Sequence, residues 1–500
     1  RLSTRIRLRP NTMEHPHQKM KLEISKEKSA VMPMYIRKRA IYQQHPAIVA
    51  WDLNIVSRMK YLGVMLYCKM DWFPHSQYLE NKLLKIRNNL VRCSKATWGI
   101  SFSNLITIYK QAILPSITYA AEAWHFSPST RAKVKLKQIQ RSYLLFVTKA
   151  YRTVSNDALY AIAGTMPIDQ AILLHKDIKA LKRGLPTNAI VPENKRMELP
   201  FKTTNINPSE DHICVHTSGK EGVAEVSIYT DGSKTQSHVG SGVVIEHNSK
   251  EIHIDAKRLH TNCTVFQAEL YAIKMATDWI TKQPHKHHSY AIHVDSQAAL
   301  LAIANKKTTQ PIAANIRTKT IQLKKTTRIT FHWVKGHVGL RGNERADYLA
   351  KTVASHQSTI AYSAIPIASG KKMLEQYYIN IWNSTYSNSE SARHTKLFIP
   401  NIPHRLSLSL WPNYILTQFL TNHGCFRSYL HRMNKIPSPI CNCPEKAIQT
   451  AHHLLTECSS FSKERPRVLQ VTSLPEVLKH HIHTVNVSNF ITAIFRKLQE

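Results

Sequence analysis

The middle third of the chain carries the pattern of an α/β fold, in which helices pack on a mixed sheet of five strands. Short runs of alternating apolar and polar residues follow residue 223 and recur near residues 290 and 330, a period of two that is typical of strands. Between these runs, apolar residues recur at helical spacing. We therefore expect an α/β domain at residues 223–355, between a mainly helical amino-terminal region and a small carboxyl-terminal metal-binding region.

The amino-terminal region is expected to be helical. Leu79, Leu83, Ile86 and Leu90 recur at helical spacing with Lys and Arg between them. This pattern predicts a basic amphipathic helix from Tyr78 to about Thr97. Three further helical stretches are expected, at Leu105–Trp124 with a break at Pro115, at Val134–Lys149 and at Ala158–Lys182.

The α/β domain is expected to begin with an antiparallel meander and to end with a helix. Its strands are predicted at Val226–Thr230, Ser241–Glu246, Glu251–Asp255, Tyr290–Asp295 and Arg328–Val334. A helix is predicted at Phe266–Ile280, two more between the last two strands, and a final one from Asn343, which we expect to cap it.

The 500-residue chain is longer than one hydrophobic core usually supports, so several folded units are expected. Residues 184–222 contain prolines without a sustained period, which is typical of a linker. The expected segments are 1–183, mainly helical; 184–222, the linker; 223–355, the α/β domain; 356–435, a helical connection; 436–465, the metal-ligand region; and 466–500, a mostly exposed helical tail.

Charge and cysteine usage narrow the class of protein. The chain has 68 Lys and Arg against 32 Asp and Glu, a net charge of +36, which indicates a nucleic-acid partner more strongly than a merely basic surface. No apolar run is long enough to span a bilayer, so no membrane partner is expected, and no feature indicates an oligomeric state. The eight cysteines suit a reducing, intracellular setting. Because the chain begins at Arg1 within polar sequence, we expect it to be part of a longer reading frame.

Four carboxylates stand at or beside the ends of predicted elements. Asp231 and Asp295 follow strands, Glu269 lies one position off the buried stripe of its helix, and Asp347 lies one turn into the last helix. Any one of them alone is more simply a helix cap or a surface ion pair. Together, in so basic a chain, they predict a site for Mg²⁺, which prefers hard oxygen ligands from separate elements.

The residues around these carboxylates resemble the ribonuclease H family in order, spacing and flanks. The resemblance covers about 130 residues and rests on Tyr229–Ser233, Gln267–Leu270, Val294–Ser296 and Trp333–Asp347. It implies an RNase H-like fold that cleaves the RNA strand of RNA–DNA hybrids with two Mg²⁺ ions, or with Mn²⁺ in their place. It also implies that Asp231 bridges both ions, that Asp347 completes the site of the ion activating water, and that Glu269 and Asp295 bind the ion beside the leaving oxygen.

The same resemblance assigns supporting residues. His337 matches a mobile loop histidine that assists proton transfer and product release, its alternative being a loop histidine without a role. Gly232, Ser233 and Gln297 are expected to contact the substrate, where the ribose 2′-hydroxyl distinguishes RNA from DNA. One departure is that Val265 and Phe266 precede Glu269 where family members carry polar residues that help to read the RNA.

The amino-terminal region resembles the end of a reverse transcriptase of non-LTR retrotransposons, from the last palm strands into the thumb. The matching residues are Lys21–Ile24 with Lys28, then Lys60–Val64, Trp72 and His75, followed by the basic helix. The alternative is an unrelated basic helical domain. Polymerisation needs adjacent aspartates, and the chain has no Asp-Asp pair, so reverse transcriptase activity is not expected from it.

Near the carboxyl terminus, Cys441, Cys443, His453 and Cys458 offer four ligands within 18 residues, which suits one structural Zn²⁺. His453 is preferred to His452 because of its spacing from Cys458. Together with Leu420–Gly424 and Tyr429–Leu430, the cluster is similar to the cysteine–histidine region that ends many insect-type retrotransposon polyproteins. The alternative is a set of reduced structural cysteines.

These observations predict the carboxyl-terminal part of a non-LTR retrotransposon polyprotein. Its expected partners are RNA–DNA hybrid at the carboxylates, and template RNA or target DNA at the zinc knuckle. The expected location is intracellular, in the nucleus or in cytoplasmic ribonucleoprotein. The alternative function is a captured or decaying element that is catalytically silent and acts as a basic nucleic-acid-binding protein.

Overall fold

A computed structural model describes residues 30–32, 34, 54–125, 129–187, 197–201, 212–219, 221–236, 238–283, 288–324, 326–355, 359–482 and 484–500. The segments Lys21–Ile24 and Lys28, which contribute to the reverse transcriptase resemblance, lie outside these residues. The chain divides into two compact units. One unit combines residues 1–176 with residues 378–500, and the other comprises residues 177–377.

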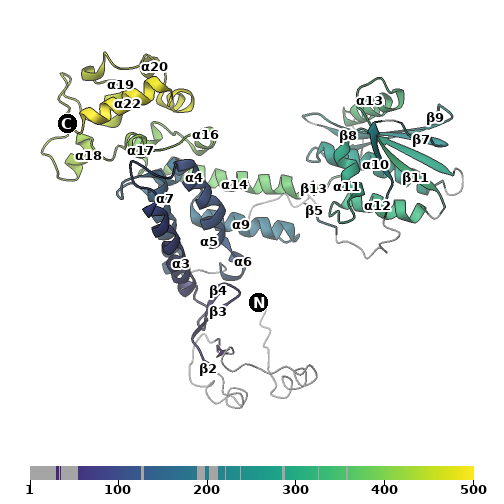
Figure 1. Cartoon of the computed structure of the whole chain (residues 1–500), viewed down its shortest axis with the longest axis horizontal. Helices are drawn as coiled ribbons and strands as arrows, with labels where there is room; N and C mark the ends of the chain where they lie inside the picture. The colour runs from purple at the N-terminus through teal and green to yellow at the C-terminus, as the bar shows by residue number, and fades with distance from the viewer. Residues whose placement is uncertain are drawn as a thin grey trace. The chain divides into compact units, whose positions relative to one another are not determined.

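The second unit is built on a mixed sheet of seven strands in the order β12-β9-β8-β7-β10-β11-β6 (Figure 1). β7 is antiparallel to β8, and β8 to β9, whereas β7, β10, β11 and β6 run parallel. The strands are β6 (Val215–Gly219), β7 (Val226–Lys234), β8 (Val239–His247), β9 (Lys250–Leu259), β10 (Ser289–Val294), β11 (Arg328–Val334) and β12 (Ile360–Tyr362).

Helices cover both faces of this sheet. Ile228 and Ile292 point toward α10 and α12 in the main core, while Tyr229 and Val244 pack against Ala346 of α13 on the opposite face. The helices are α10 (Val265–Thr281), α11 (Gln297–Ala304), α12 (Pro311–Leu323) and α13 (Arg341–Ser355). The five predicted strands and four predicted helices are therefore all present. β7, β8 and β9 are longer than the sequence pattern indicated, β10 is shifted by one residue, and β11 has the predicted bounds.

Two edge strands enlarge the sheet beyond the five that were predicted. β6 lies within the segment that was predicted as a linker, and it pairs with β11. A second short pair, β5 (Met197–Glu198) with β13 (Ile365–Pro366), also begins in that segment. The linker assignment was thus wrong for residues 197–198 and 215–219. The cause is that β6 is largely exposed and polar, so it lacks the alternation that marks a strand with one buried face.

The amino-terminal part of the first unit is helical, as predicted. A hairpin precedes the helices, and its two-residue turn places Leu62 and Gly63 at positive φ. Its elements are β1 (Ala30–Val31), β2 (Asn54–Ile55), β3 (Arg58–Tyr61), β4 (Val64–Tyr67), α3 (Phe73–Arg92), α4 (Phe102–Ile108), η1 (Tyr109–Ile113), α5 (Leu114–Thr118), α6 (Ala121–Trp124), α7 (Thr130–Thr148), α8 (Asn156–Ala163) and α9 (Ile168–Lys182).

Proline and glycine interrupt two of the helical stretches that were predicted. The break expected at Pro115 is a short π-helix, η1, directly before the short helix that contains the proline. The stretch predicted as one helix at Ala158–Lys182 is two, because α8 ends at Gly164 in the left-handed region with φ 61°, and α9 starts after Pro167. The basic helix predicted to end near Thr97 ends at Arg92.

The carboxyl-terminal part completes the same unit from residue 378, within α14, onward. Its elements are α14 (Ile367–Asn388), α15 (Arg393–Lys396), α16 (Ile402–Ser407), α17 (Tyr414–Thr421), α18 (Arg427–Arg432), α19 (Ala451–Thr456), η2 (Ser459–Phe461), α20 (Val468–Val471), α21 (Leu474–Glu476), η3 (Val477–His481) and α22 (Val485–Lys497). In the described part of the chain, no helix combines the length and the apolar character that crossing a membrane would require.

One large core joins the two ends of this unit. Leu83 of α3 and Leu144 of α7 belong to the same buried cluster as Phe419 of α17 and Ile494 of α22. The final residues are therefore not a mostly exposed tail, which corrects that prediction. α22 buries Val487, Phe490, Ile491, Ile494 and Phe495, a helical stripe that requires a partner surface.

Candidate active site and metal centre

Two aspartates lie side by side at one edge of the central sheet. In the parallel pair β7–β10, Thr230 is opposite Val294, so Asp231 and Asp295 are the next residues on neighbouring strands. The indole nitrogen of Trp333 donates to the Asp295 carbonyl at 3.0 Å, which fixes the backbone there. Carboxylate oxygens of Asp231, Asp295 and Glu269 all lie within 4.8 Å of one another. Asp231 itself lies within β7 rather than at its end, because the strand continues to Lys234.

The helix α10 brings Glu269 to the two aspartates. Its amino terminus is fixed by a capping box in which Thr264 and Gln267 exchange hydrogen bonds. Gly232 allows the close approach, because a Cβ atom at that position would lie 2.3 Å from the backbone nitrogen of Glu269. The missing side chain of Gly232 therefore serves the contact between strand and helix, whereas the sequence suggested an approach to a ligand.

Burial and neighbouring negative charges destabilise the ionised forms of the three carboxylates. Burial, followed by the charges of Asp295 and Asp347, raises the pKa of Asp231 to about 7. Burial and the charges of Asp231 and Asp295 raise the pKa of Glu269 to about 9, although the Gly232 amide opposes this rise. Burial also raises the pKa of Asp295. A bound cation would offset the repulsion among these carboxylates and favour their ionised forms.

Asp347 borders this cluster from α13. It contributes to the raised pKa of Asp231, but its own carboxylate accepts a hydrogen bond of 2.6 Å from Lys351 one turn further along the helix. Asn343 does not cap α13, because the helix begins at Arg341. Instead its buried side chain hydrogen-bonds Asp295 and holds down the pKa of that carboxyl against the effect of burial. Asn343 is thus a site residue that the sequence reasoning missed, since it was interpreted as the cap of the last helix.

The other predicted site residues differ in their exposure and in their relation to the carboxylates. His337 is exposed at φ 56°, and the neighbouring Gly336 lies against Asp295, where an added Cβ would be 3.0 Å from the Oδ2 atom. The charge of a protonated His337 favours ionised Asp295, which places the histidine within electrostatic reach. Ser233 is half-buried on β7, and Gln297 is exposed at the first position of α11.

The two residues before Glu269 that differ from the family pattern, Val265 and Phe266, lie in different surroundings. Val265 is 45% exposed at the start of α10, whereas Phe266 packs against the main core of the unit. Val265 is therefore the more exposed of the two apolar side chains.

The carboxylates fit hard, oxygen-preferring ions. Three oxygens from separate elements converge, and the Oε2 atom of Glu269 and the Oδ1 atom of Asn343 are buried without a hydrogen-bond partner among the described residues. Buried oxygens of this kind are costly unless a cation or water satisfies them. The donor set contains no sulfur or imidazole, which suits Mg²⁺ or Mn²⁺.

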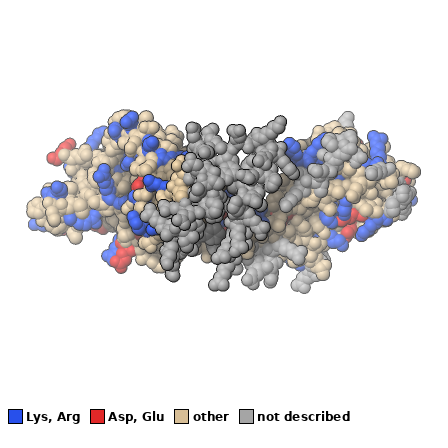
Figure 2. Space-filling model, turned by 90° about the horizontal axis from the view of Figure 1, so that it is seen from below, with Lys and Arg blue, Asp and Glu red and all other residues tan. Residues whose placement is uncertain are grey.

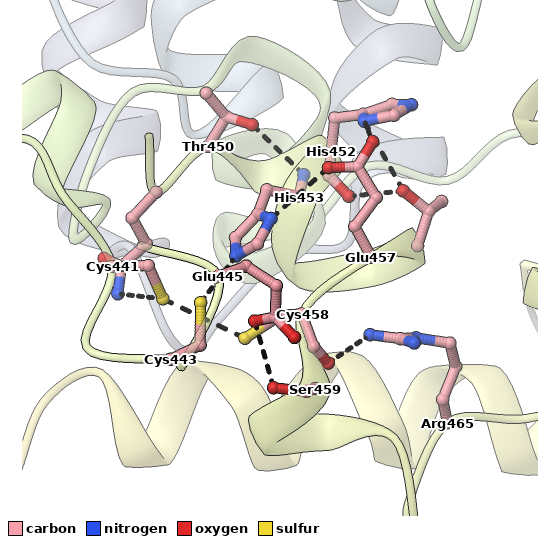
Figure 3. Close-up of polar contacts among 12 residues, drawn as sticks. Cys441, Cys443, Glu445, Thr450, His452, His453, Glu457, Cys458, Ser459 and Arg465 are labelled. Atoms are coloured by element: carbon pink, nitrogen blue, oxygen red, sulfur yellow. Dashed lines mark hydrogen bonds and ion pairs between the residues drawn. The ribbon is translucent and has the colours of Figure 1, made fainter. Parts of the chain in front are cut away.

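A second cluster lies in the first unit, where the three predicted cysteines and His453 point toward one another (Figure 3). All four side chains are buried. The Sγ atoms of Cys441 and Cys458 are 3.9 Å apart, and the Sγ atom of Cys443 is 3.3 Å from Nε2 of His453. Sulfur ligands at about 2.3 Å from a tetrahedral ion would be separated by about 3.8 Å, so the spacing suits Zn²⁺.

Neighbouring side chains hold these ligands in place. Glu457 lies 3.3 Å from Nδ1 of His453, which leaves Nε2 facing the sulfurs. Gln449 donates to the Sγ atom of Cys441 at 3.6 Å. His452 is directed away from the cluster toward Glu457, as Figure 3 shows, so the structure agrees with the preference for His453.

The cysteines are part of the main core rather than of a separate small knuckle. Cys441, Cys443 and Cys458 pack in the same cluster as Leu454 of α19 and Phe490 of α22. Burial and the neighbouring acidic and sulfur groups raise the pKa of Cys443 to about 12, so its thiol needs a cation to ionise near neutral pH. The expectation of a self-contained region at 436–465 was based on sequence spacing, which does not show what surrounds the ligands.

Fold and site together define a domain of the ribonuclease H class. The family model described as RNase H matches residues 223–355. Over 117 residues the chain is 31% identical to "Retrovirus-related Pol polyprotein from type-1 retrotransposable element R1 4" of Nasonia vitripennis, covering 23% of this chain and 30% of the relative. Over 189 residues it is 24% identical to the R1 2 polyprotein of the same species, and the match covers 36% of this chain and 46% of the relative.

A solved foamy virus protease–reverse transcriptase is 19% identical with a TM-score of 0.24, covering 27% of this chain and 21% of that one, a likeness too weak to support an argument. The chain spans less than half the length of the two R1 polyproteins. It therefore contains an RNase H domain and is homologous, over part of its length, to Pol polyproteins of R1 retrotransposable elements.

Proposed function

We propose that residues 223–355 cleave the RNA strand of RNA–DNA hybrids with Mg²⁺, as part of a non-LTR retrotransposon Pol polyprotein that removes template RNA after first-strand synthesis. The observation that carries this proposal is the convergence of Asp231, Glu269 and Asp295 within 4.8 Å, in a domain that matches the RNase H family. The relatives are named as retrotransposon polyproteins, which supports the biological setting.

Each carboxylate has a distinct role in this proposal. Asp231 is central to the cluster and would bridge two ions, Glu269 and Asp295 would hold the ion beside the leaving oxygen, and Asp347 would complete the other site. Bound Mg²⁺ supplies charge neutralisation and an activated water for an in-line displacement. Asp347 must first release Lys351, whose side chain is 57% exposed and can turn toward solvent.

His337 lies outside the ligand set. Its loop passes over Asp295, and its exposed ring can exchange protons with solvent and with the cleaved ends. A residue at this place would assist proton transfer and product release without being needed for ion binding.

The test uses the full chain with a short RNA–DNA hybrid and the matching DNA duplex, in Mg²⁺. Asp231→Asn should abolish cleavage of the RNA strand, whereas Asp255→Asn, the same change at a half-exposed residue on β9 paired with Lys257, should leave it intact. Loss of a bridging ligand removes ion placement and charge neutralisation together, effects worth several kcal/mol, or roughly a thousandfold in rate. Full activity in Asp231→Asn would refute the assignment.

The alternative function is that of a catalytically silent nucleic-acid-binding protein, and the observation that supports it is the excess of basic side chains. Lys and Arg outnumber Asp and Glu on the visible surface of both units (Figure 2), in keeping with the net charge of +36. This alternative predicts hybrid binding without cleavage in any divalent metal. The same assay therefore separates the two functions.

The cysteine–histidine cluster would hold one structural Zn²⁺. Its four positions are all filled by protein, which leaves no open site for chemistry, and its burial in the core makes it a stabilising element. Elemental analysis of the full chain should find one equivalent of zinc, and Cys443→Ser should lose it.

A further inference from the structure

A groove in the first unit has the chemistry of a nucleic-acid site, separate from the RNase H carboxylates. It has a volume of about 520 Å³ and lies between the carboxyl-terminal ends of α3 and α7 and the beginning of α17. Four cations line it, Arg87, Lys95, Lys149 and Arg152, and its lining includes no Asp or Glu. Within the described residues, none of the four forms an ion pair with a carboxylate. Their charge is therefore available to an anionic ligand.

Aromatic rings form the wall between these cations. The rings of Tyr151 and Tyr414 are stacked with centroids 6.2 Å apart, and their hydroxyl groups are 2.9 Å apart. Phe146 also lines the groove, with the ammonium group of Lys149 4.8 Å from the centre of its ring. All three aromatic side chains are half-buried, so each keeps part of its ring accessible. Cations that alternate with partly exposed rings are the pattern by which proteins hold single strands.

Two backbone features fix the cations at the rim. Lys149 is the residue after α7 and has φ 56°, a conformation in which glycine is the usual residue, and its ammonium group donates to the hydroxyl of Ser94 at 2.5 Å. Lys95 lies on a tight loop closed by a hydrogen bond of 2.9 Å from its amide to the carbonyl of Trp98, whose side chain is 59% exposed. The ammonium group of Lys149 and the backbone of Lys95 are therefore held at the rim before any ligand arrives.

The motif Leu420–Gly424, which is not part of the RNase H site, supports the segment after α7 that carries Tyr151. The ring of Tyr151 lies edge-on to Tyr429 at 5.9 Å. Thr153 shares its hydroxyl with Nδ1 of His423 and with the hydroxyl of Tyr429, each at 2.9 Å. These contacts connect the chain after α7 to the segment that leads into the cysteine–histidine cluster.

We propose that this groove binds a single strand of nucleic acid, with backbone phosphates on the four cations and a base against the aromatic wall. A single strand is favoured over a duplex because only unpaired bases offer their faces to tyrosine and phenylalanine rings. The site is independent of the RNase H proposal, since none of its residues contributes to the carboxylate cluster.

The test measures binding of fluorescent 12-nucleotide oligo(U) and oligo(dT) to the full chain by anisotropy, across a series of KCl concentrations. The groove variant is Lys149→Glu with Arg152→Glu. Its control is Lys463→Glu with Lys479→Glu, which makes the same change in charge at two exposed residues of the same unit. The groove variant should bind at least tenfold more weakly, and its salt slope should fall by about 1.4, because each phosphate contact on a single strand contributes about 0.7. The control should change less than threefold.

A DNA duplex of the same length distinguishes the groove from general attraction by a basic surface. The groove variant should lose less than threefold in duplex affinity. Equal losses in the groove variant and its control, or equal losses for single strand and duplex, would overturn the proposal. A similar loss for oligo(U) and oligo(dT) identifies the shared phosphate and base chemistry, and a larger loss for oligo(U) identifies additional ribose contacts.

Folding is checked separately. The zinc content and the hybrid cleavage rate of the groove variant should equal those of the parent chain. If the double variant fails to fold, Arg152→Ala replaces it, because that side chain is exposed and its loss removes one phosphate contact. Unchanged single-strand binding in a folded Arg152→Ala chain, with an unchanged salt slope, would also overturn the proposal.

Discussion

Replacing Asp231 with Asn should stabilise the folded protein in Mg²⁺-free buffer while it removes the proposed ion site. The folded-state pKa of Asp231 is raised to about 7, so ionisation of this carboxyl opposes folding as the pH rises. An acid whose folded pKa is raised contributes its stability fully at low pH, and that contribution is lost between the unfolded pKa near 4 and the folded pKa near 7. At pH 8 the loss is complete, and the neutral amide of the Asp231→Asn variant avoids it.

The size of the effect follows from the same shift. A rise of the Asp231 pKa from 3.8 to about 7 corresponds to at most about 4 kcal/mol at pH 8. Part of that rise depends on the charges of Asp295 and Asp347, which titrate together with Asp231, so we expect a gain of about 2 kcal/mol. Hydrogen exchange followed by mass spectrometry, on peptides from β7 and α10, measures this free energy within the full chain. The gain should disappear at pH 4.

Magnesium should reverse the order of stability, so that the parent chain becomes more stable than the Asp231→Asn variant. Saturating Mg²⁺ stabilises the parent chain through binding to its folded form, and the amide that replaces the Asp231 carboxylate is a poorer ligand, so the parent should gain more protection than the variant. Because the Asp231→Asn chain is expected to be both more stable and inactive, unfolding cannot explain its loss of cleavage. Equal or lower protection of Asp231→Asn at pH 8 without Mg²⁺ would refute the electrostatic reasoning.

Three further predictions address other residues. His337→Asn, which tolerates the positive φ, should lower turnover while Mg²⁺ affinity measured by calorimetry stays nearly unchanged; a collapse of that affinity would make the histidine a ligand. His453→Ala should release zinc in elemental analysis and His452→Ala should not, and retention of zinc in both would contradict the ligand set. Gly232→Ala should cost about 2 kcal/mol or more in stability and reduce cleavage, because its Cβ would meet the backbone of Glu269; unchanged protection of α10 would show that the contact can yield.

The sequence was sufficient for the elements whose spacing is strongly periodic. β7, β8 and α10 were predicted from the patterns of a strand and a helix, to which Val226, Ile228 and Leu270 belong, although helices cover both faces of β7 and β8. β6 was missed because its pairing partner, β11, lies more than 100 residues away and neither face of β6 is deeply buried. Edge strands of this kind depend on the sheet that receives them.

In the candidate site, too, some features could be predicted from the sequence and others could not. Asp231 and Asp295 were predicted because each follows a run of alternating apolar residues that is typical of a strand, and the parallel register of β7 and β10 brings them together. The bond of Lys351 to Asp347 and the bond of Asn343 to Asp295 depend on where α13 begins and how it rotates, which the sequence pattern does not fix within a turn. The burial of α22 was missed because sequence spacing does not show what its apolar stripe packs against, which includes α17 and the ring of Phe461.

The discontinuous first unit has a consequence for synthesis of the protein. Its core unites Leu144 with Ile494, while residues 177–377 form a unit of their own between the two contributing segments. At roughly 5–20 residues per second, a ribosome needs on the order of 10 to 40 s to pass from one segment to the other. During that interval the amino-terminal helices carry apolar faces without their final partners, so the RNase H domain can complete its fold first. Chaperone binding to nascent chains should accordingly concentrate on α8, whose partners α16 and α17 belong to the later segment, until those helices have emerged.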